Sequence, residues 1–134
     1  MSRLTVNVDG GARGNPGPAA IGVVVRDGGG EVVAERGERI GEATNNVAEY
    51  RALLLGLELA KQLGGTELEL IGDSELVVRQ VEGRYKVKNA GMKELYEKTK
   101  AALRDFDSWS IRHVRREHNA DADRLVNEAL DGDG

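Results

Sequence analysis

The chain has 134 residues, of which 40% are hydrophobic and 31% are charged, and this fits a single globular domain over residues 1–134. The absence of cysteine and the presence of only two histidines exclude disulfides, thiolate-bound zinc and a histidine-rich metal centre. No apolar run approaches the roughly 20 residues that cross a membrane, and no signal peptide is evident. We therefore expect a cytoplasmic protein, and the lack of an extended apolar face predicts a monomer without an obligate protein partner.

The first forty residues are expected to form an antiparallel meander. Apolar and polar residues alternate over 4–9, which predicts a two-faced strand that ends at Asp9. Further strands are predicted at 20–26 and 31–40, joined by the turn sequence Asp-Gly-Gly-Gly. The loop at 10–18 contains four glycines and both prolines, so a ligand can approach its backbone closely.

The remainder of the chain alternates helices with strands. Thr-Asn-Asn at 44–46 predicts the cap of a helix over 47–63, which a Gly-Gly pair ends. The later elements are expected to be a strand at 67–71, a helix at 74–81, a connector at 83–89, a helix at 92–105, a strand at 109–115 and a helix at 121–130. The order βββαβααβα predicts an α/β fold with a mixed five-stranded sheet and helices on both of its faces.

Four acidic residues stand where a purely structural role explains them poorly. Asp9 and Asp73 follow strands, Glu49 lies on the apolar stripe of its helix, and Asp123 lies near the start of the last helix. An unpaired buried carboxylate is costly, so Glu49 must be neutralised, hydrogen-bonded or bound to a cation. A rim position for Glu49 and a helix cap for Asp73 remain open at this point. Oxygen ligands suit Mg²⁺ or Mn²⁺ and a phosphoryl-transfer site.

Two segments are basic although the net charge is −4. Residues 79–88 contain four basic residues and one acid, and residues 111–118 contain three arginines and one acid. Such local surfaces can face a polyanion while the remaining surface repels it. Charge alone equally allows solvated faces of helices and strands.

The sequence resembles type 1 ribonuclease H in five blocks that follow the order and spacing of that family. They are VDGGARGNPGPAAIG at 8–22, TNNVAEYRALLLGL at 44–57, GDSELVVRQVEG at 72–83, YKVKN at 85–89 and REHNADADRLVNEAL at 116–130. The resemblance implies a ribonuclease H-like fold. It also implies an endoribonuclease that hydrolyses the RNA strand of RNA–DNA hybrids to 5′-phosphate and 3′-hydroxyl ends.

By resemblance, the catalytic and metal-binding residues are Asp9, Glu49, Asp73 and Asp123. They are expected to hold two Mg²⁺ ions, with Mn²⁺ as a substitute, and Asp9 on the central strand is expected to bridge them. Asp121 competes with Asp123 for the fourth position, although a helix-start role explains it better.

The resemblance also implies residues that contact the hybrid, whose 2′-hydroxyl groups distinguish RNA from DNA. The minor groove is expected to meet Asn15, Asn45 and Glu49 and the backbone of Gly11 and Arg13. A pocket for a DNA-strand phosphate is expected at Thr44, and backbone phosphates are expected at Lys86, Lys88 and Asn89.

The chain departs from the best-known bacterial pattern in three ways. The basic protrusion is reduced to residues 83–89, Glu75 stands where a glutamine often contacts a base, and the loop before Asp123 is short. An auxiliary proton-transfer role for His118 therefore stays open against that of a surface imidazole. This shorter form resembles archaeal and some bacterial members.

Two other functions compete with this one. A Holliday-junction resolvase or transposase-like nuclease shares the fold, but it does not need the Asn-Pro-Gly and Thr-Asn-Asn blocks. A hybrid-binding module with a decayed site is disfavoured because all four acids are present.

Overall fold

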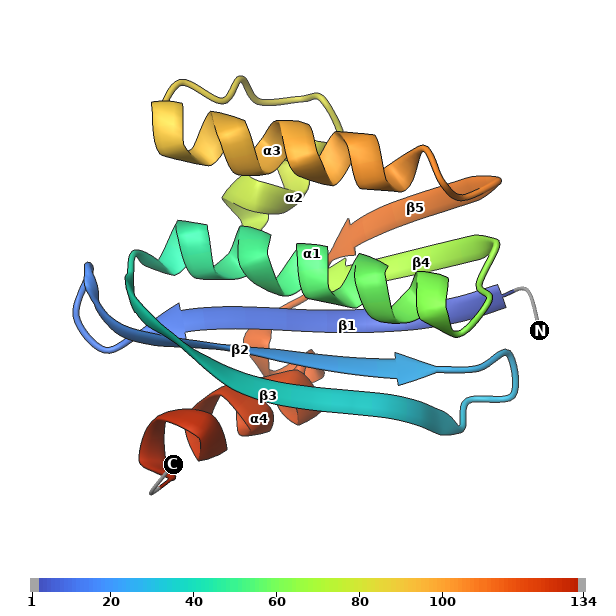
Figure 1. Ribbon diagram of the computed structural model, residues 1–134, viewed down its shortest axis with the longest axis horizontal. Coiled ribbons are helices and arrows are strands. Elements are labelled where there is room, and N and C mark those ends of the chain that lie inside the picture. Colours follow the sequence, from blue (N-terminus) through green and yellow to red (C-terminus); the bar gives the residue numbers. More distant parts are fainter. Residues whose placement is uncertain (1–2, 133–134) are drawn as a thin grey trace.

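Five strands form one mixed sheet with helices on both of its faces in the computed structural model, which describes residues 3–132 (Figure 1). The strands are β1 (Arg3–Ala12), β2 (Gly17–Arg26), β3 (Val32–Ala43), β4 (Glu67–Gly72) and β5 (Ser108–His113). The helices are α1 (Asn45–Gln62), α2 (Glu75–Val81), α3 (Ala90–Leu103), the short 3-10 helix η1 (Arg116–His118) and α4 (Ala120–Asp131). Within residues 3–132, none of the helices has the length and apolar character needed to cross a bilayer.

The sheet has the order β3-β2-β1-β4-β5, so β1 is its central strand. β1 pairs with β2 in antiparallel register and with β4 in parallel register, and β4 pairs with β5 in parallel register. Because the carboxyl ends of β1 and β4 meet at one edge of the sheet, Asp9 and the residues that follow β4 come together there. The predicted fold class and element order are confirmed.

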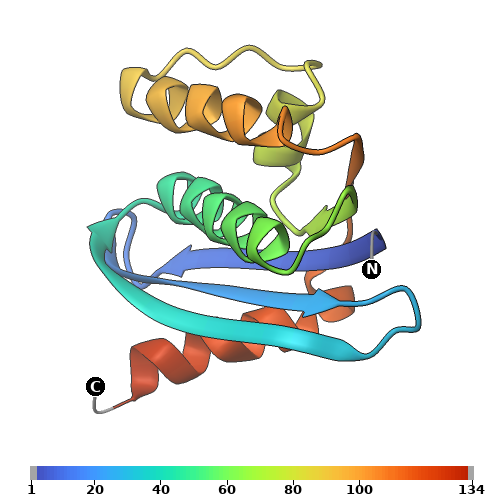
Figure 2. The ribbon, with the colours of Figure 1, turned by 45° about the vertical axis from the view of Figure 1, so that its right-hand side comes forward.

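The two faces of β1 have different partners. Leu4, Val6 and Val8 are almost fully buried in the core that α1 covers, whereas Asn7 lies on the α4 side and bonds Asn119. Successive side chains of a strand point to opposite faces, so the alternation seen in the sequence supplies both layers. Figure 2 shows α4 crossing the face of the sheet opposite α1.

The start of α1 packs directly against the backbone of β1. A Cβ added at Gly10 would lie 2.2 Å from the carbonyl carbon of Ala48, a separation that no real side chain occupies. Glycine at this position therefore lets the helix approach the strand closely enough to bring Glu49 beside Asp9.

The boundaries differ from the predicted ones at several elements. β1 continues three residues beyond Asp9, because the pairs from Gly10↔Ile21 to Ala12↔Ala19 extend the antiparallel ladder and shorten the loop to 13–16. α1 begins at Asn45, because the Thr44 side chain accepts the cap hydrogen bond from Val47. The predicted strand at 109–115 ends at residue 113, and η1, which was not predicted, follows it.

Candidate active site

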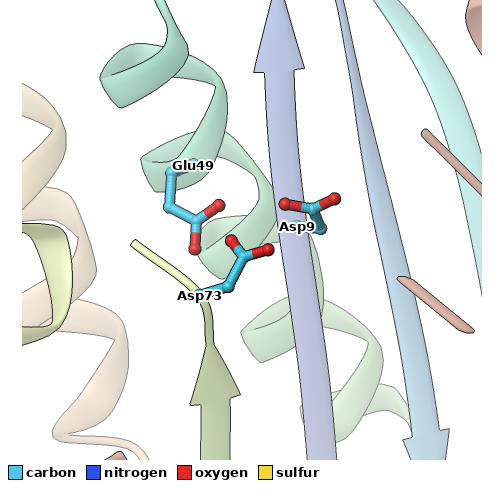
Figure 3. Close-up of side chains that lie close together, drawn as sticks. All are labelled: Asp9, Glu49 and Asp73. Atoms are coloured by element: carbon cyan, nitrogen blue, oxygen red, sulfur yellow. The ribbon is translucent and has the colours of Figure 1, made fainter. Parts of the chain in front are cut away.

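Three carboxylates from three separate elements gather at the carboxyl edge of the sheet. Asp9 lies on β1, Glu49 on α1 and Asp73 directly after β4. Each offers an oxygen atom, and these atoms all lie within 4.8 Å of one another. Figure 3 shows the three side chains turned toward a common space. Three of the four acids that the resemblance implied therefore form one cluster.

Glu49 is a buried residue and not a rim residue, with an exposed fraction of 2%. Its Oε1 accepts a hydrogen bond of 2.9 Å from the amide of Gly10, and the amide of Ser74 also donates to the carboxylate. A Cβ at Gly72 would lie 2.8 Å from Oε2, so the missing side chain there makes room for the carboxylate. The rim alternative is therefore wrong, because the backbone of two strand ends encloses the group.

The carboxylates repel one another. Burial, followed by the charges of Asp73 and Asp123, raises the pKa of Asp9 to about 8. Burial, followed by Asp9 and Asp73, raises the pKa of Glu49 well above its ordinary value, and burial raises that of Asp73. An all-oxygen donor set whose acids are shifted toward the protonated form fits a hard divalent cation, whose positive charge would favour the ionised form of each acid.

Asp123 faces the same cavity, but an arginine holds its carboxylate. The cavity has a volume of about 520 Å³ and is lined by Asp9, Glu49, Asp73, Asp123 and Arg116, among others. Arg116 donates from Nη2 and Nε to Asp123 Oδ1, at 3.0 and 3.3 Å. The pKa of the Arg116 guanidinium is raised mainly by Asp123. The negative charges of Asp9 and Asp73 raise it further by a smaller amount.

Arg116 lines the cavity and bonds Asp123, and the sequence did not single it out. It was present in the last block of the resemblance, and its signal was a basic residue seven positions before the fourth acid. Asn127 and Leu130 also line the cavity and were not singled out, whereas Ser74, which lines it too, is the cap of α2 in place of Asp73.

Asp121 and His118 lie away from this cavity. Asp121 forms an ion pair with Arg26, and both residues line a separate hollow together with the exposed His118. The structure therefore presents Asp123, and not Asp121, to the carboxylate cluster, as the sequence favoured. His118 does not line the cavity of the carboxylates.

A buried amide network fixes α4 to the central strand. Asn119, which is 2% exposed, donates from Nδ2 to the carbonyl of Val8 at 2.8 Å. Its Oδ1 accepts a hydrogen bond of 3.0 Å from Nδ2 of Asn7. Because Asn119 directly precedes α4, these two bonds set the position of Asp123 relative to Asp9.

Residues 7–129 match the family model described as reverse transcriptase-like. Over 129 residues, 96% of its length, the chain is 47% identical to the ribonuclease HI of Halobacterium salinarum. The chain belongs to the ribonuclease H family. It spans 65% of the length of that relative, and 36% of the length of the bifunctional protein Rv2228c of Mycobacterium tuberculosis, to which it is 46% identical.

A solved member of the ribonuclease H family has the same fold with a ligand. The structure of LC11-RNase H1, a protein isolated from compost, in complex with an RNA/DNA hybrid superposes with a TM-score of 0.91 at 47% identity. The superposition covers 96% of each chain.

Asn15 and Asn45, two of the expected groove residues of this ribonuclease H chain, are linked by hydrogen bonds at the junction of the β1–β2 hairpin and α1. Oδ1 of Asn45 accepts a hydrogen bond of 2.8 Å from the amide of Ala12, and Oδ1 of Asn15 accepts one of 3.1 Å from the amide of Asn45. Both side chains are exposed. Because both side-chain oxygens accept from the protein backbone, the Nδ2 groups are the parts of these amides that remain to donate to a ligand.

Other expected contact residues have structural duties as well. Thr44 caps α1, and Oδ1 of Asn89 caps α3 by accepting from Met92 at 3.1 Å. The Arg13 amide donates to the Pro18 carbonyl at 2.8 Å, and its side chain pairs with Asp131 at 2.6 Å.

The remaining expected contact residues differ in their distance from the carboxylates. Gly11 lines the cavity of the carboxylates, whereas Lys86 and Lys88 are exposed on the connector outside it.

Proposed function

We propose that the chain is a metal-dependent endoribonuclease that hydrolyses the RNA strand of RNA–DNA hybrids to 5′-phosphate and 3′-hydroxyl ends, acting as a single-domain monomer. The observation that carries this proposal is the cluster of Asp9, Glu49 and Asp73 at one edge of a ribonuclease H sheet. The hybrid bound to LC11-RNase H1, a protein of the same fold, supports the substrate class.

The metal is proposed to be Mg²⁺, as two ions with Mn²⁺ as a substitute, held by Asp9, Glu49, Asp73 and Asp123. When bound, the ions supply activation of water and stabilisation of charge on the leaving 3′ oxygen. The protein holds Glu49 in place through the amides of Gly10 and Ser74, so this ligand does not have to reorganise when a cation arrives.

Arg116 has a different duty in this proposal. It holds the Asp123 carboxylate at the edge of the cavity, and its guanidinium places one positive charge among four acids. The group therefore reduces repulsion toward an anionic phosphate and keeps Asp123 oriented until a cation competes for it.

Discrimination of RNA from DNA is proposed to lie at the junction of the β1–β2 hairpin with the start of α1. The Nδ2 groups of Asn15 and Asn45 are positioned to donate to oxygen acceptors in the minor groove, including the 2′-hydroxyl. Thr44, Lys86, Lys88 and Asn89 supply phosphate contacts around it. Base identity plays no part in such contacts, so cleavage of hybrids is expected at many sequences.

Cleavage of a labelled hybrid with and without Mg²⁺ tests the proposal, with a DNA duplex and a DNA four-way junction of the same sequence as controls. We expect the RNA strand alone to be cut, cleavage to stop in EDTA, and excess Mg²⁺ to restore it. Cleavage of the DNA substrates would favour the resolvase function, and binding without cleavage would favour the hybrid-binding module.

A further inference from the structure

A buried polar pair joins α1 to α2 behind the site. The hydroxyl of Tyr50 donates to Oε1 of Gln80 at 2.6 Å. Both side chains are buried, with exposed fractions of 0% and 3%. Two apolar residues of similar shape would fill this space without the cost of burying polar atoms, so core packing does not require the pair.

The second half of the Gln80 amide reaches the basic connector that we define as residues 83–89. Its Nε2 donates to the carbonyl of Lys86 at 3.4 Å. The connector also bonds α2 through the amides of Arg84 and Tyr85, which donate to the carbonyl of Arg79 at 2.9 and 3.3 Å. Among the residues described, the Gln80 amide is the hydrogen-bond partner of the backbone from 86 to 88.

Neighbouring side chains of the connector around this anchor differ in burial. Val87 packs against the hydrophobic core, whereas Lys86 and Lys88 on either side of it are exposed. An inward valine and an anchored carbonyl thus fix the direction in which two lysines point. Without the anchor, Val87 would be the remaining contact between the Arg84 and Tyr85 bonds to α2 and the Asn89 cap of α3, and the lysines would sample a wider range of positions.

Tyr50 also follows Glu49 in the sequence of α1. Adjacent helical residues are about 100° apart around the axis, so one turn of α1 presents a carboxylate to the catalytic edge and a hydroxyl to α2. The same turn of α1 therefore positions both the candidate metal ligand Glu49 and, through Tyr50 and Gln80, the connector.

We propose that Tyr50 and Gln80 are positioning residues for substrate binding, which hold the connector so that Lys86 and Lys88 meet the phosphate backbone of the bound duplex. The proposal rests on the hybrid as substrate. It assigns a binding role to two buried side chains that cannot touch the ligand themselves.

Steady-state cleavage of a hybrid by the Gln80→Met chain tests the proposal, because methionine keeps the volume and loses both hydrogen bonds. We expect KM to rise about three- to tenfold while kcat stays within about twofold, since the catalytic edge is untouched. The slope of log KM against the logarithm of the salt concentration should fall by up to about 2, because each of the two lost phosphate contacts contributes about 1 to that slope. Thr99→Val is the matched control: it removes a buried hydrogen bond from Thr99 to the carbonyl of Leu95 and should leave KM unchanged.

A double-mutant cycle separates positioning from general loosening. In a chain that carries Lys86→Ala and Lys88→Ala, Gln80→Met should raise KM no further, because the two ammonium groups that Gln80 is proposed to position are absent. An equal rise in both backgrounds, or a fall in kcat at constant KM, would overturn the proposal. Tyr50→Phe, which leaves Gln80 in place, provides the same cycle if Gln80→Met does not fold.

Amide hydrogen exchange tests the anchor without any substrate. Faster exchange at Arg84 and Tyr85 in the Gln80→Met chain is expected, and unchanged exchange there would contradict the anchoring. If the wild-type chain cleaves no hybrid, the proposed function fails, whereas this exchange measurement still reports on the connector.

Discussion

The carboxylate cluster and the groove residues are built on opposite principles. Asp9 and Glu49 are 6% and 2% exposed and are held by the central strand and by a helix packed directly against it. Asn15, Asn45, Lys86 and Lys88 are exposed. The side-chain oxygens of the two asparagines accept hydrogen bonds from backbone amides, and the Lys86 carbonyl accepts one from Gln80. The proposed reactive groups therefore depend on the core, whereas the proposed recognition groups lie at the surface, where residues can vary without disturbing the core.

The strongest test of this contrast is to neutralise the buried cluster. Asp9→Asn, Glu49→Gln and Asp73→Asn should each lower kcat by at least about 10³-fold, because each removes a ligand that the others cannot replace. Single-turnover cleavage in Mg²⁺ measures this effect. Glu58→Gln, on the exposed side of the same helix, is the control and should change kcat less than about twofold.

A smaller effect is expected for the fourth carboxylate, which the structure places at the edge of the cluster. Asp123→Asn should lower kcat by about 10²–10³-fold in Mg²⁺, and Mn²⁺ should restore part of the activity because it accepts a depleted carboxylate shell more readily. Asp121→Asn, two residues away and paired with Arg26, should lower kcat less than about threefold. Equal losses in the two variants would contradict the assignment of Asp123.

Changes among the groove residues should affect discrimination more than chemistry. Asn15→Ala and Asn45→Ala should each weaken transition-state binding by about 1–3 kcal/mol, the cost of leaving a buried partner unsatisfied. Hybrids with single 2′-deoxy substitutions locate the loss at the nucleotides that each side chain contacts. If the wild-type and altered chains respond alike to every substitution, these asparagines serve only the hairpin–helix junction.

Stability of the metal-free protein should fall as the pH rises. Asp9 has a pKa of about 8 in the folded protein and an ordinary value of 3.8, so between these values the folded chain keeps a proton that the unfolded chain has released. Unfolding therefore releases a proton, and a higher pH favours it, at a cost of about 1–3 kcal/mol between pH 5 and pH 8. Denaturant melts in EDTA measure this loss, which Asp9→Asn should reduce and which Mg²⁺ should oppose at pH 8. An unfolding free energy that is independent of pH in EDTA would show that the pKa of Asp9 is not raised in the folded protein.

The smallest effect is expected at His118. The residue is exposed and lines a hollow apart from the carboxylates, so His118→Ala should lower kcat by less than about tenfold. A positioned proton-transfer group contributes about 10²–10⁴-fold, and a loss in that range at constant KM would identify His118 as such a group.

The element order follows from local patterns, whereas the gathering of the acids was implied by the resemblance of the five sequence blocks to ribonuclease H. Strand alternation, helix caps and the apolar stripe under Glu49 are all readable over a few residues. The extension of β1 past Asp9 was not, because its pairing with β2 overrides the glycines. Arg116 was missed for a related reason: its ion pair with Asp123 depends on a 3-10 turn that no local pattern announces.

The amide network of Asn7 and Asn119 affects the order in which the four acids come together during synthesis. Asp9, Glu49 and Asp73 are made early and can gather once β4 has docked beside β1. Asp123 joins them only when α4 packs on the other face of the sheet and Asn119 donates its hydrogen bond to the carbonyl of Val8. An incomplete chain on the ribosome, surrounded by RNA, therefore carries three of the four proposed metal ligands and lacks the fourth.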